Sequence, residues 1–95
     1  MLLKFTCPCC GYKILTQQPP GTFEICAICF WEDDEYQYNN PSDKGGANEM
    51  SLKEAQENFL AIGACDKESV KFVRAPTKED VKDKNFIRCE QQRPH

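Results

Sequence analysis

The chain has 95 residues, a net charge of −3 and seven cysteines. A domain of this length buries only about 60–65% of the surface that its unfolded chain exposes, so chains of this size often add disulfides or a metal. No apolar run approaches the ~20 residues of a membrane-spanning helix, and the N-terminus is too short and too soon polar for a signal peptide. We therefore expect a cytoplasmic protein with reduced thiols, in which clustered cysteines bind metal.

The first thirty residues contain two Cys-x-x-Cys pairs, Cys7 with Cys10 and Cys26 with Cys29, separated by fifteen residues. A gap of two residues lets a tight turn point both sulfur atoms at one ion, and this spacing is typical of tetrahedral zinc. We predict one structural zinc ion held by these four thiolates. Cys9 lies inside the first pair, so the sequence leaves open which cysteines of residues 7–10 are the ligands. Iron binding, redox chemistry and disulfides are the alternatives to zinc for the two pairs.

The segment between the two pairs is predicted to form a β-hairpin. Residues 12–16 alternate in hydrophobicity as a strand does, residues 19–21 break the strand, and residues 22–25 are predicted to return beside it. The aromatic residues 30–31 follow the last cysteine directly. We expect them to cover the metal and to pack on a helix further along the chain.

The middle of the chain is acidic, since residues 31–60 hold eight acidic residues against two lysines. Four of the acids are consecutive: Glu32, Asp33, Asp34 and Glu35. Residues 32–48 are predicted to form a loop, because they are acidic and then rich in Asn, Pro, Ser and Gly. We predict that the four consecutive acids contact a basic protein partner. A solvated loop without a partner, and a catalytic or cation-binding site, are the alternatives for this run. The same charge argues against nucleic acid, whose phosphates demand a basic footprint.

One helix is predicted with a defined beginning and end, at about residues 51–62. Ser51 and Glu54 are spaced as a capping box, in which each side chain accepts from the other residue's backbone amide. The apolar residues that then fall on one face at helical spacing are Leu52, Ala55, Phe59 and Ile62. Gly63 supplies the expected end of this helix.

The C-terminal part carries weaker patterns. Residues 70–74 are predicted to form a strand or the end of a short helix, and residues 77–80 to begin a third helix. The chain from about Cys89 onward is predicted to be frayed. Cys65, like Cys89, has no matched partner in the sequence and is expected to be a small core side chain.

No catalytic constellation is visible in the sequence, so we do not expect an enzyme. His95 is the only histidine and stands at the end of the chain, which argues against a Cys–His nucleophile. Four thiolates around one zinc ion would also leave no open position for a catalytic water.

Several short motifs together resemble the bacterial cysteine-rich CPCC family. They are CPCCGY at residues 7–12, EIC-x-x-CFWEDD at residues 24–34, GGAN at residues 45–48 and SL-x-EA at residues 51–55. The resemblance covers about residues 5–76, so we treat residues 1–76 as a CPCC-like domain and residues 77–95 as a C-terminal extension. It implies a small bacterial cytoplasmic protein with a zinc-ribbon-like core. Such small proteins often resemble the immunity partners of polymorphic toxins.

The sequence therefore predicts an α+β fold, in which a small zinc ribbon of short antiparallel strands and two cysteine knuckles packs against one capped helix. The predicted function is a non-enzymatic, zinc-stabilised protein-binding module. Its specific form is an immunity protein that neutralises a basic toxin domain through an acidic surface, with neither nucleic acid nor membrane as a partner.

Two alternatives stay open at this point. One is a thiol redox or metal-buffering protein that works through Cys9, Cys65 or Cys89. The other is a nucleic-acid-binding zinc ribbon, whose support is a set of basic residues interleaved with acids: Lys71, Arg74, Lys78, Lys82, Lys84 and Arg88.

Overall fold

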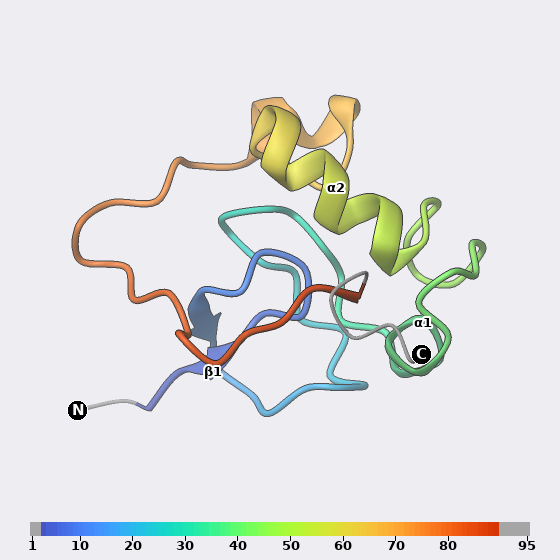
Figure 1. Ribbon diagram of the computed structural model, residues 1–95, viewed down its shortest axis with the longest axis horizontal. Coiled ribbons are helices and arrows are strands. Elements are labelled where there is room, and N and C mark those ends of the chain that lie inside the picture. Colours follow the sequence, from blue (N-terminus) through green and yellow to red (C-terminus); the bar gives the residue numbers. More distant parts are fainter. Residues whose placement is uncertain (1–2, 90–95) are drawn as a thin grey trace.

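The computed structural model describes residues 3–89, in the order β1 (Phe5–Thr6), β2 (Lys13–Leu15), α1 (Glu35–Asn39), α2 (Leu52–Ile62) and the 3-10 helix η1 (Lys67–Phe72). β1 and β2 form a two-stranded antiparallel sheet. The loops of the first thirty residues pack against one side of α2, and η1 lies beside the C-terminal end of α2 (Figure 1). A short antiparallel sheet, a few helices and a cysteine cluster agree with the predicted α+β class.

The hydrophobic core joins the cysteine-bearing loops to α2. Its buried members are Cys7, Cys9, Cys10, Leu15, Cys26, Ile28, Cys29, Trp31, Leu52, Ala55 and Cys65. Trp31 is only 1% exposed, while Phe30 and Phe59 are half-buried and pack against this cluster. Ile62 is 46% exposed, so the apolar face of α2 contacts the core through Leu52, Ala55 and Phe59 and leaves it at the end of the helix.

The beginning and the end of α2 confirm the helix predicted at residues 51–62. The Ser51 side chain accepts from the Glu54 N–H at 3.1 Å, and the Glu54 carboxylate accepts from the Ser51 N–H at 3.2 Å. Gly63 follows the helix with a φ of 81° and donates its N–H to the carbonyl of Phe59 at 2.9 Å. Glycine adopts this left-handed conformation without the steric cost that a Cβ would add.

The pairing of the strand segments differs from the prediction. The sequence predicts that residues 12–16 pair with residues 22–25, but β2 pairs with β1 instead. Residues 23–26 pair with residues 31–33 through backbone hydrogen bonds of 2.9 to 3.0 Å. Each cysteine pair therefore lies in the turn of its own hairpin, because the two-residue gap between the cysteines is itself the turn that reverses the chain.

Residues 32–48 are not the continuous loop that their composition predicts, since they contain α1. Asp34 caps this helix by accepting from the N–H of Gln37 at 2.9 Å. The Gln37 side chain is fully buried and donates to the carbonyls of Asn48 and Met50 at 3.1 and 3.0 Å. A helix of five residues is too short to show an apolar period, so only its N-cap residue could have indicated it.

The C-terminal part contains one confirmed alternative and one wrong prediction. Residues 70–72 end η1, which agrees with the short-helix alternative. The third helix predicted at residues 77–80 is a turn, in which the Asp80 carboxylate accepts from the Thr77 N–H at 2.7 Å. The chain then continues in extended form, because residues 81–83 find backbone partners beside β2.

Within residues 3–89, no helix has the length and apolar character needed to cross a membrane. The predictions made for residues 90–95, namely the frayed end and the lone His95, lie outside the described residues. Cys89 is described and is half-buried.

Candidate metal centre

Two short hairpins bring together the sulfur atoms of Cys7, Cys10, Cys26 and Cys29, the four residues that the spacing singles out. These atoms all lie within 4.8 Å of one another, and each side chain is at most 2% exposed. The Cys7 and Cys29 sulfurs are 3.6 Å apart, and the Cys10 and Cys26 sulfurs 3.7 Å. Four sulfurs about 2.3 Å from a central zinc ion form a tetrahedron with edges of about 3.8 Å, whereas a disulfide needs about 2.05 Å. The cluster therefore has the dimensions of a tetrathiolate metal site.

The two hairpins share one backbone pattern. In each, the first cysteine donates its N–H to the carbonyl five residues ahead and accepts, at its own carbonyl, from the N–H four residues ahead, over 2.8 to 3.0 Å. The residues so joined are Cys7, Gly11 and Tyr12 in one hairpin and Cys26, Phe30 and Trp31 in the other. Gly11 and Phe30 both adopt a left-handed φ, of 81° and 71°. We call residues 7–12 the first knuckle and residues 26–31 the second knuckle.

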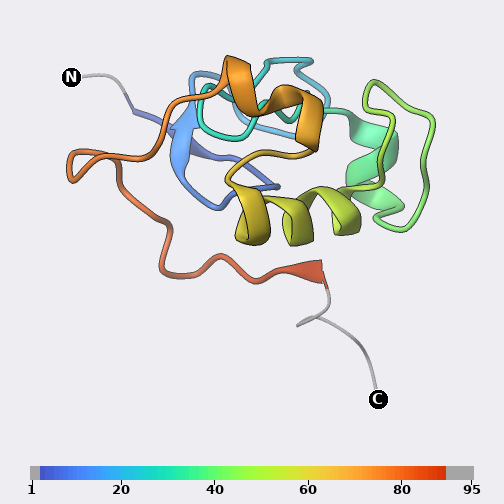
Figure 2. The same cartoon turned by 90° about the horizontal axis from the view of Figure 1, so that it is seen from above.

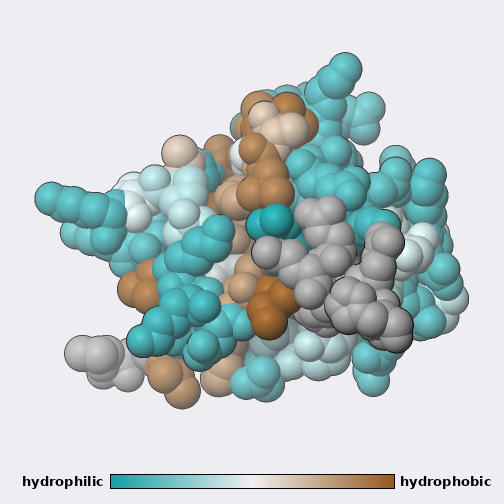
Figure 3. Space-filling model, viewed as in Figure 1, coloured by the Kyte–Doolittle hydropathy of each residue, from teal (hydrophilic) through white to brown (hydrophobic). Residues whose placement is uncertain are grey.

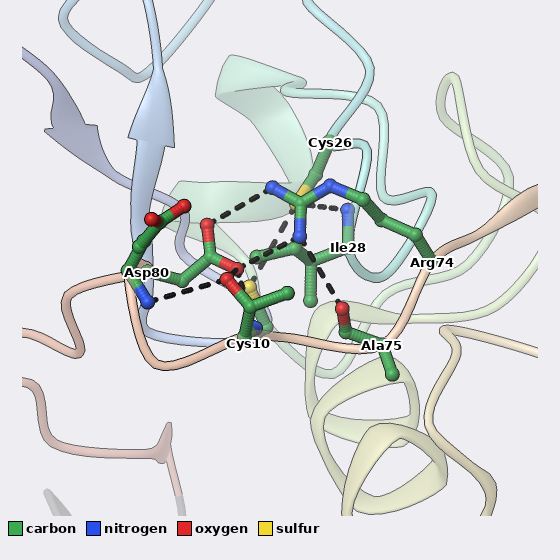
Figure 4. A network of polar contacts seen from close by, with 8 residues as sticks. Cys10, Cys26, Ile28, Arg74, Ala75 and Asp80 are labelled. Carbon is green, nitrogen blue, oxygen red and sulfur yellow. Dashed lines mark hydrogen bonds and ion pairs between the residues drawn. The ribbon is translucent and has the colours of Figure 1, made fainter.

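The second knuckle also aims a backbone amide at a sulfur atom. The N–H of Ile28 lies 3.4 Å from the sulfur of Cys26 (Figure 4). An amide in this position favours the thiolate form, which is the form that binds a metal. The turn therefore supplies part of the electrostatic stabilisation that the cluster needs.

A cationic side chain lies beside the second knuckle. Arg74 donates its backbone N–H to the carbonyl of Ala27 at 3.2 Å. Figure 4 shows its guanidinium bound to Asp80, through contacts of 2.8 and 2.9 Å. The hydrogen bond to Asp80 raises the pKa of Arg74, and the negative charge of Cys26 adds to this. A divalent ion on four thiolates would carry a net charge of −2, and the Arg74–Asp80 ion pair beside it adds no net charge.

The remaining cysteines lie outside the cluster. Cys9 is 2% exposed but is not among the four sulfurs that lie within 4.8 Å of one another, so the structure pairs Cys7 with Cys10 in the first knuckle. Burial raises the pKa of the Cys65 thiol to about 12 and also raises that of Cys89. Both thiols therefore keep their protons at neutral pH, which makes them weak nucleophiles.

Comparison with known protein families decides how this chain is related to others. The sequence profile of the cysteine-rich CPCC family matches residues 5–80, which include all four cysteines of the cluster and the whole of α2. The chain belongs to the cysteine-rich CPCC family. A search of curated proteins gives no match.

The four consecutive acids of this CPCC protein do not share one surface. Asp33 is 0% exposed and accepts from the N–H and the hydroxyl of Thr22 at 2.9 and 2.8 Å. Asp34 is 8% exposed and accepts from two backbone amides at 2.9 and 2.8 Å. Glu32 is half-buried and Glu35 is exposed. The two middle carboxylates therefore bind the protein's own chain, and only the outer two reach solvent.

Sequence reasoning missed one residue that supports the cysteine cluster of this CPCC protein. Gln56 is 4% exposed and donates to the carbonyl of Pro8, inside the first knuckle, at 2.8 Å. Its side-chain oxygen accepts from the N–H of Cys89 at 2.9 Å. Gln56 follows Leu52 by four residues and so lies on the apolar face of α2, where a polar side chain needs a partner. A glutamine on the apolar face of the predicted helix was therefore the signal in the sequence that this side chain has a buried hydrogen-bond partner.

Proposed function

We propose that this CPCC protein is a non-enzymatic protein-binding module stabilised by one structural zinc ion. The buried tetrahedron of four sulfur atoms carries the proposal. Thiolates in this arrangement are the preferred ligands of structural zinc, and four protein ligands leave no coordination position for a reactive water. The ion would join the two knuckles into a zinc ribbon. Its role would be to hold a small core together.

In this proposal the partner binds the acidic side of the molecule. Six acidic side chains between residues 32 and 57 are exposed or half-buried, against two lysines. The acids are Glu32, Glu35, Asp43, Glu49, Glu54 and Glu57, and the lysines are Lys44 and Lys53. Figure 3 shows hydrophilic side chains covering the loop that follows α1. Such a surface suits a basic partner, whose association it would accelerate.

The specific form of the proposal is an immunity protein that covers the basic groove of a toxin domain. A toxin that acts on nucleic acid needs a basic groove to bind phosphates, and an acidic protein can compete for the same groove. The exposed acids of α1 and of the following loop support this form. Asp33 and Asp34 would contribute by shaping that loop, not by touching the partner.

The two alternative functions have weaker support. The thiol alternative needs an accessible, acidic thiol, but Cys9 and Cys65 are each 2% exposed and the pKa of Cys65 is raised by burial. The nucleic-acid alternative needs basic side chains that are available to phosphates. At least three of the six have partners within the protein: Lys71 lies over the Phe72 ring, Lys82 over the Tyr12 ring, and Arg74 binds Asp80.

Native mass spectrometry of the untagged protein, taken directly from the lysate of its own host, tests the proposal. We expect one zinc ion and one stable protein partner in the same complex. Zinc without a partner would contradict the binding role. Disulfides in place of zinc would contradict the metal centre.

Charge reversal tests which surface binds the partner. Glu35→Lys with Glu49→Lys places two positive charges on the acidic side, and we expect the Kd for the captured partner to rise about tenfold or more. Glu79→Lys, compared with the single variant Glu49→Lys, is the matched control, since it makes the same charge change on an exposed residue that lies away from residues 32–57. An equal loss of affinity in both variants would mean that the partner responds to the net charge of the protein and not to the acidic surface proposed here.

A further inference from the structure

We propose that residues 81–89 form a strap that keeps the first knuckle closed and thereby sets the rate at which the metal is released. This inference rests on the metal centre of the proposed function. The family match ends at residue 80, and the strap begins at the next residue. It is therefore an addition to the matched region, yet its described contacts converge on the first knuckle and its surroundings.

The first half of the strap pairs with the backbone of β2 and of the first knuckle. Lys13 donates its N–H to the carbonyl of Val81 at 2.8 Å, and Asp83 donates its N–H to the carbonyl of Gly11 at 2.8 Å. The Asp83 carboxylate also accepts from the hydroxyl of Thr6, in β1, at 2.7 Å. The strap thus adds a third extended segment to the hairpin that carries Cys7 and Cys10.

The middle of the strap covers the turn of the first knuckle. A Cβ atom on Gly11 would lie 2.5 Å from a ring carbon of Phe86, so this ring packs directly on the glycine backbone. The ammonium group of Lys82 lies 5.6 Å from the centre of the Tyr12 ring. Because Gly11 directly follows Cys10, movement of this turn would move a sulfur ligand.

The far end of the strap reaches the same knuckle through α2. Cys89 donates its N–H to Gln56, and Gln56 in turn donates to the carbonyl of Pro8. Pro8 lies between the two cysteines of the first knuckle. Figures 1 and 2 show the strap running from the sheet to the N-terminal half of α2. The first knuckle is therefore held from outside at two points, Pro8 and Gly11.

The second knuckle has a different brace. Cys65 donates its N–H to the carbonyl of Cys29 at 2.7 Å, and Arg74 donates to the carbonyl of Ala27 at 3.2 Å. Both donors lie inside the family match, and η1, the helix between them, is on the opposite side of the molecule from the strap (Figure 2). The knuckles share one backbone pattern but are braced by separate segments, so detaching the strap would release only the first.

The strap is built to open more easily than the core. Five of its nine residues are exposed, and its other four are half-buried. Segments with few buried contacts open locally at a lower free energy than global unfolding requires. Opening would free the edge and the turn of the first knuckle, after which its two thiolates can leave the ion one after the other.

The rate of zinc transfer to an excess of a chromogenic chelator tests the strap. One variant ends after Asp80, and a second keeps the full chain but carries Asp83→Ala with Phe86→Ala. We expect both to release zinc at least about tenfold faster. This corresponds to an activation free energy for release that is lower by about 1.4 kcal/mol. Lys84→Ala is the control within the strap, because its exposed side chain takes no part in these contacts, and its rate should stay within about twofold. If the shortened chain does not fold, the full-length double variant carries the test.

Hydrogen exchange of the zinc-loaded proteins separates a local effect from general destabilisation. We expect faster exchange at the amides of the first knuckle and unchanged exchange at those of the second. Equal acceleration at both knuckles, or unchanged zinc release in the double variant, would overturn the strap. A wild-type protein that holds no zinc would overturn the metal centre itself, so the two failures are distinguishable.

Discussion

Gly11 and Phe30 occupy the same place in the two knuckles, and both have a left-handed backbone. At Gly11 the Phe86 ring leaves no room for a side chain. At Phe30 the side chain turns to the Phe72 ring and stacks on it, with ring centres 5.3 Å apart. A left-handed backbone costs a non-glycine residue about 1–2 kcal/mol, and an aromatic pair returns about 0.5–1.5 kcal/mol. The same turn therefore accepts glycine in the first knuckle and phenylalanine in the second, because Phe86 covers Gly11 whereas Phe72 stacks on Phe30.

Substitution of Gly11 by alanine should be more harmful than the same change at another left-handed glycine. Gly11→Ala meets both the backbone strain and the Phe86 ring, whereas Gly45→Ala, at a φ of 88°, meets open space. We expect Gly11→Ala to lower the free energy of unfolding by about 1–3 kcal/mol more than Gly45→Ala. Urea unfolding of the zinc-loaded proteins measures the difference. Equal losses would mean that Phe86 is not packed on the first knuckle.

Asn48 connects the chain before α1 to the chain before α2. Its side chain accepts from the N–H of Glu32 at 2.9 Å and donates to the carbonyl of Glu32 at 2.8 Å and to the Gln37 side chain at 3.0 Å. Asn48→Ala would leave buried polar groups without partners, so we expect a loss of about 2–4 kcal/mol in the free energy of unfolding. Asn39→Ala, at an exposed position of α1, is the control and should change stability by less than about 0.5 kcal/mol.

At the scale of elements, the first turn of α2 places Leu52 and Ala55 in the core, so the cap at Ser51 stabilises a buried part of the helix. Ser51→Ala removes the acceptor of the Glu54 N–H and should lower the free energy of unfolding by about 1 kcal/mol. Thermal unfolding followed by circular dichroism measures this. Ser42→Ala, in the exposed loop before α2, removes the same hydroxyl without removing a cap, and a loss as large as that of Ser51→Ala would argue against the capping box.

The elements that the sequence predicts correctly carry their determinants within a few residues of one another. Each Cys-x-x-Cys pair and the Ser51–Glu54 box are complete inside one turn, so their geometry follows from spacing alone. The burial of Asp33 depends instead on Thr22, eleven residues away. The path of the strap depends on Gly11, about seventy residues away. Such pairings are set by which backbone edges remain open after the rest of the chain has packed, which no local pattern reveals.

At the scale of the whole molecule, the four sulfur atoms belong to the hydrophobic core itself. Trp31, the only tryptophan, lies in the same buried cluster and is 1% exposed. Loss of the proposed ion would therefore affect the packing of β2 and α2 together. A chain of this size has little other buried surface to keep it folded.

Removal of the metal should unfold the domain, because the free energy of binding structural zinc is also folding free energy. We expect a strong chelator to shift the fluorescence of Trp31 to longer wavelengths and to reduce the helical circular dichroism. Both signals should return when zinc is added in excess under reducing conditions. Unchanged spectra after verified zinc removal would show that the core folds without the ion.

The two knuckles also change what the chain must do to reach its folded state. Each knuckle closes within six residues, so the thiols inside a pair meet at little entropic cost. The proposed ion then has only one longer loop to close, the fifteen residues between Cys10 and Cys26. The loss of chain entropy on closing this loop costs about 2–3 kcal/mol and grows slowly with loop length. The repeated turn thus reduces the search among four separated thiols to the meeting of two pairs.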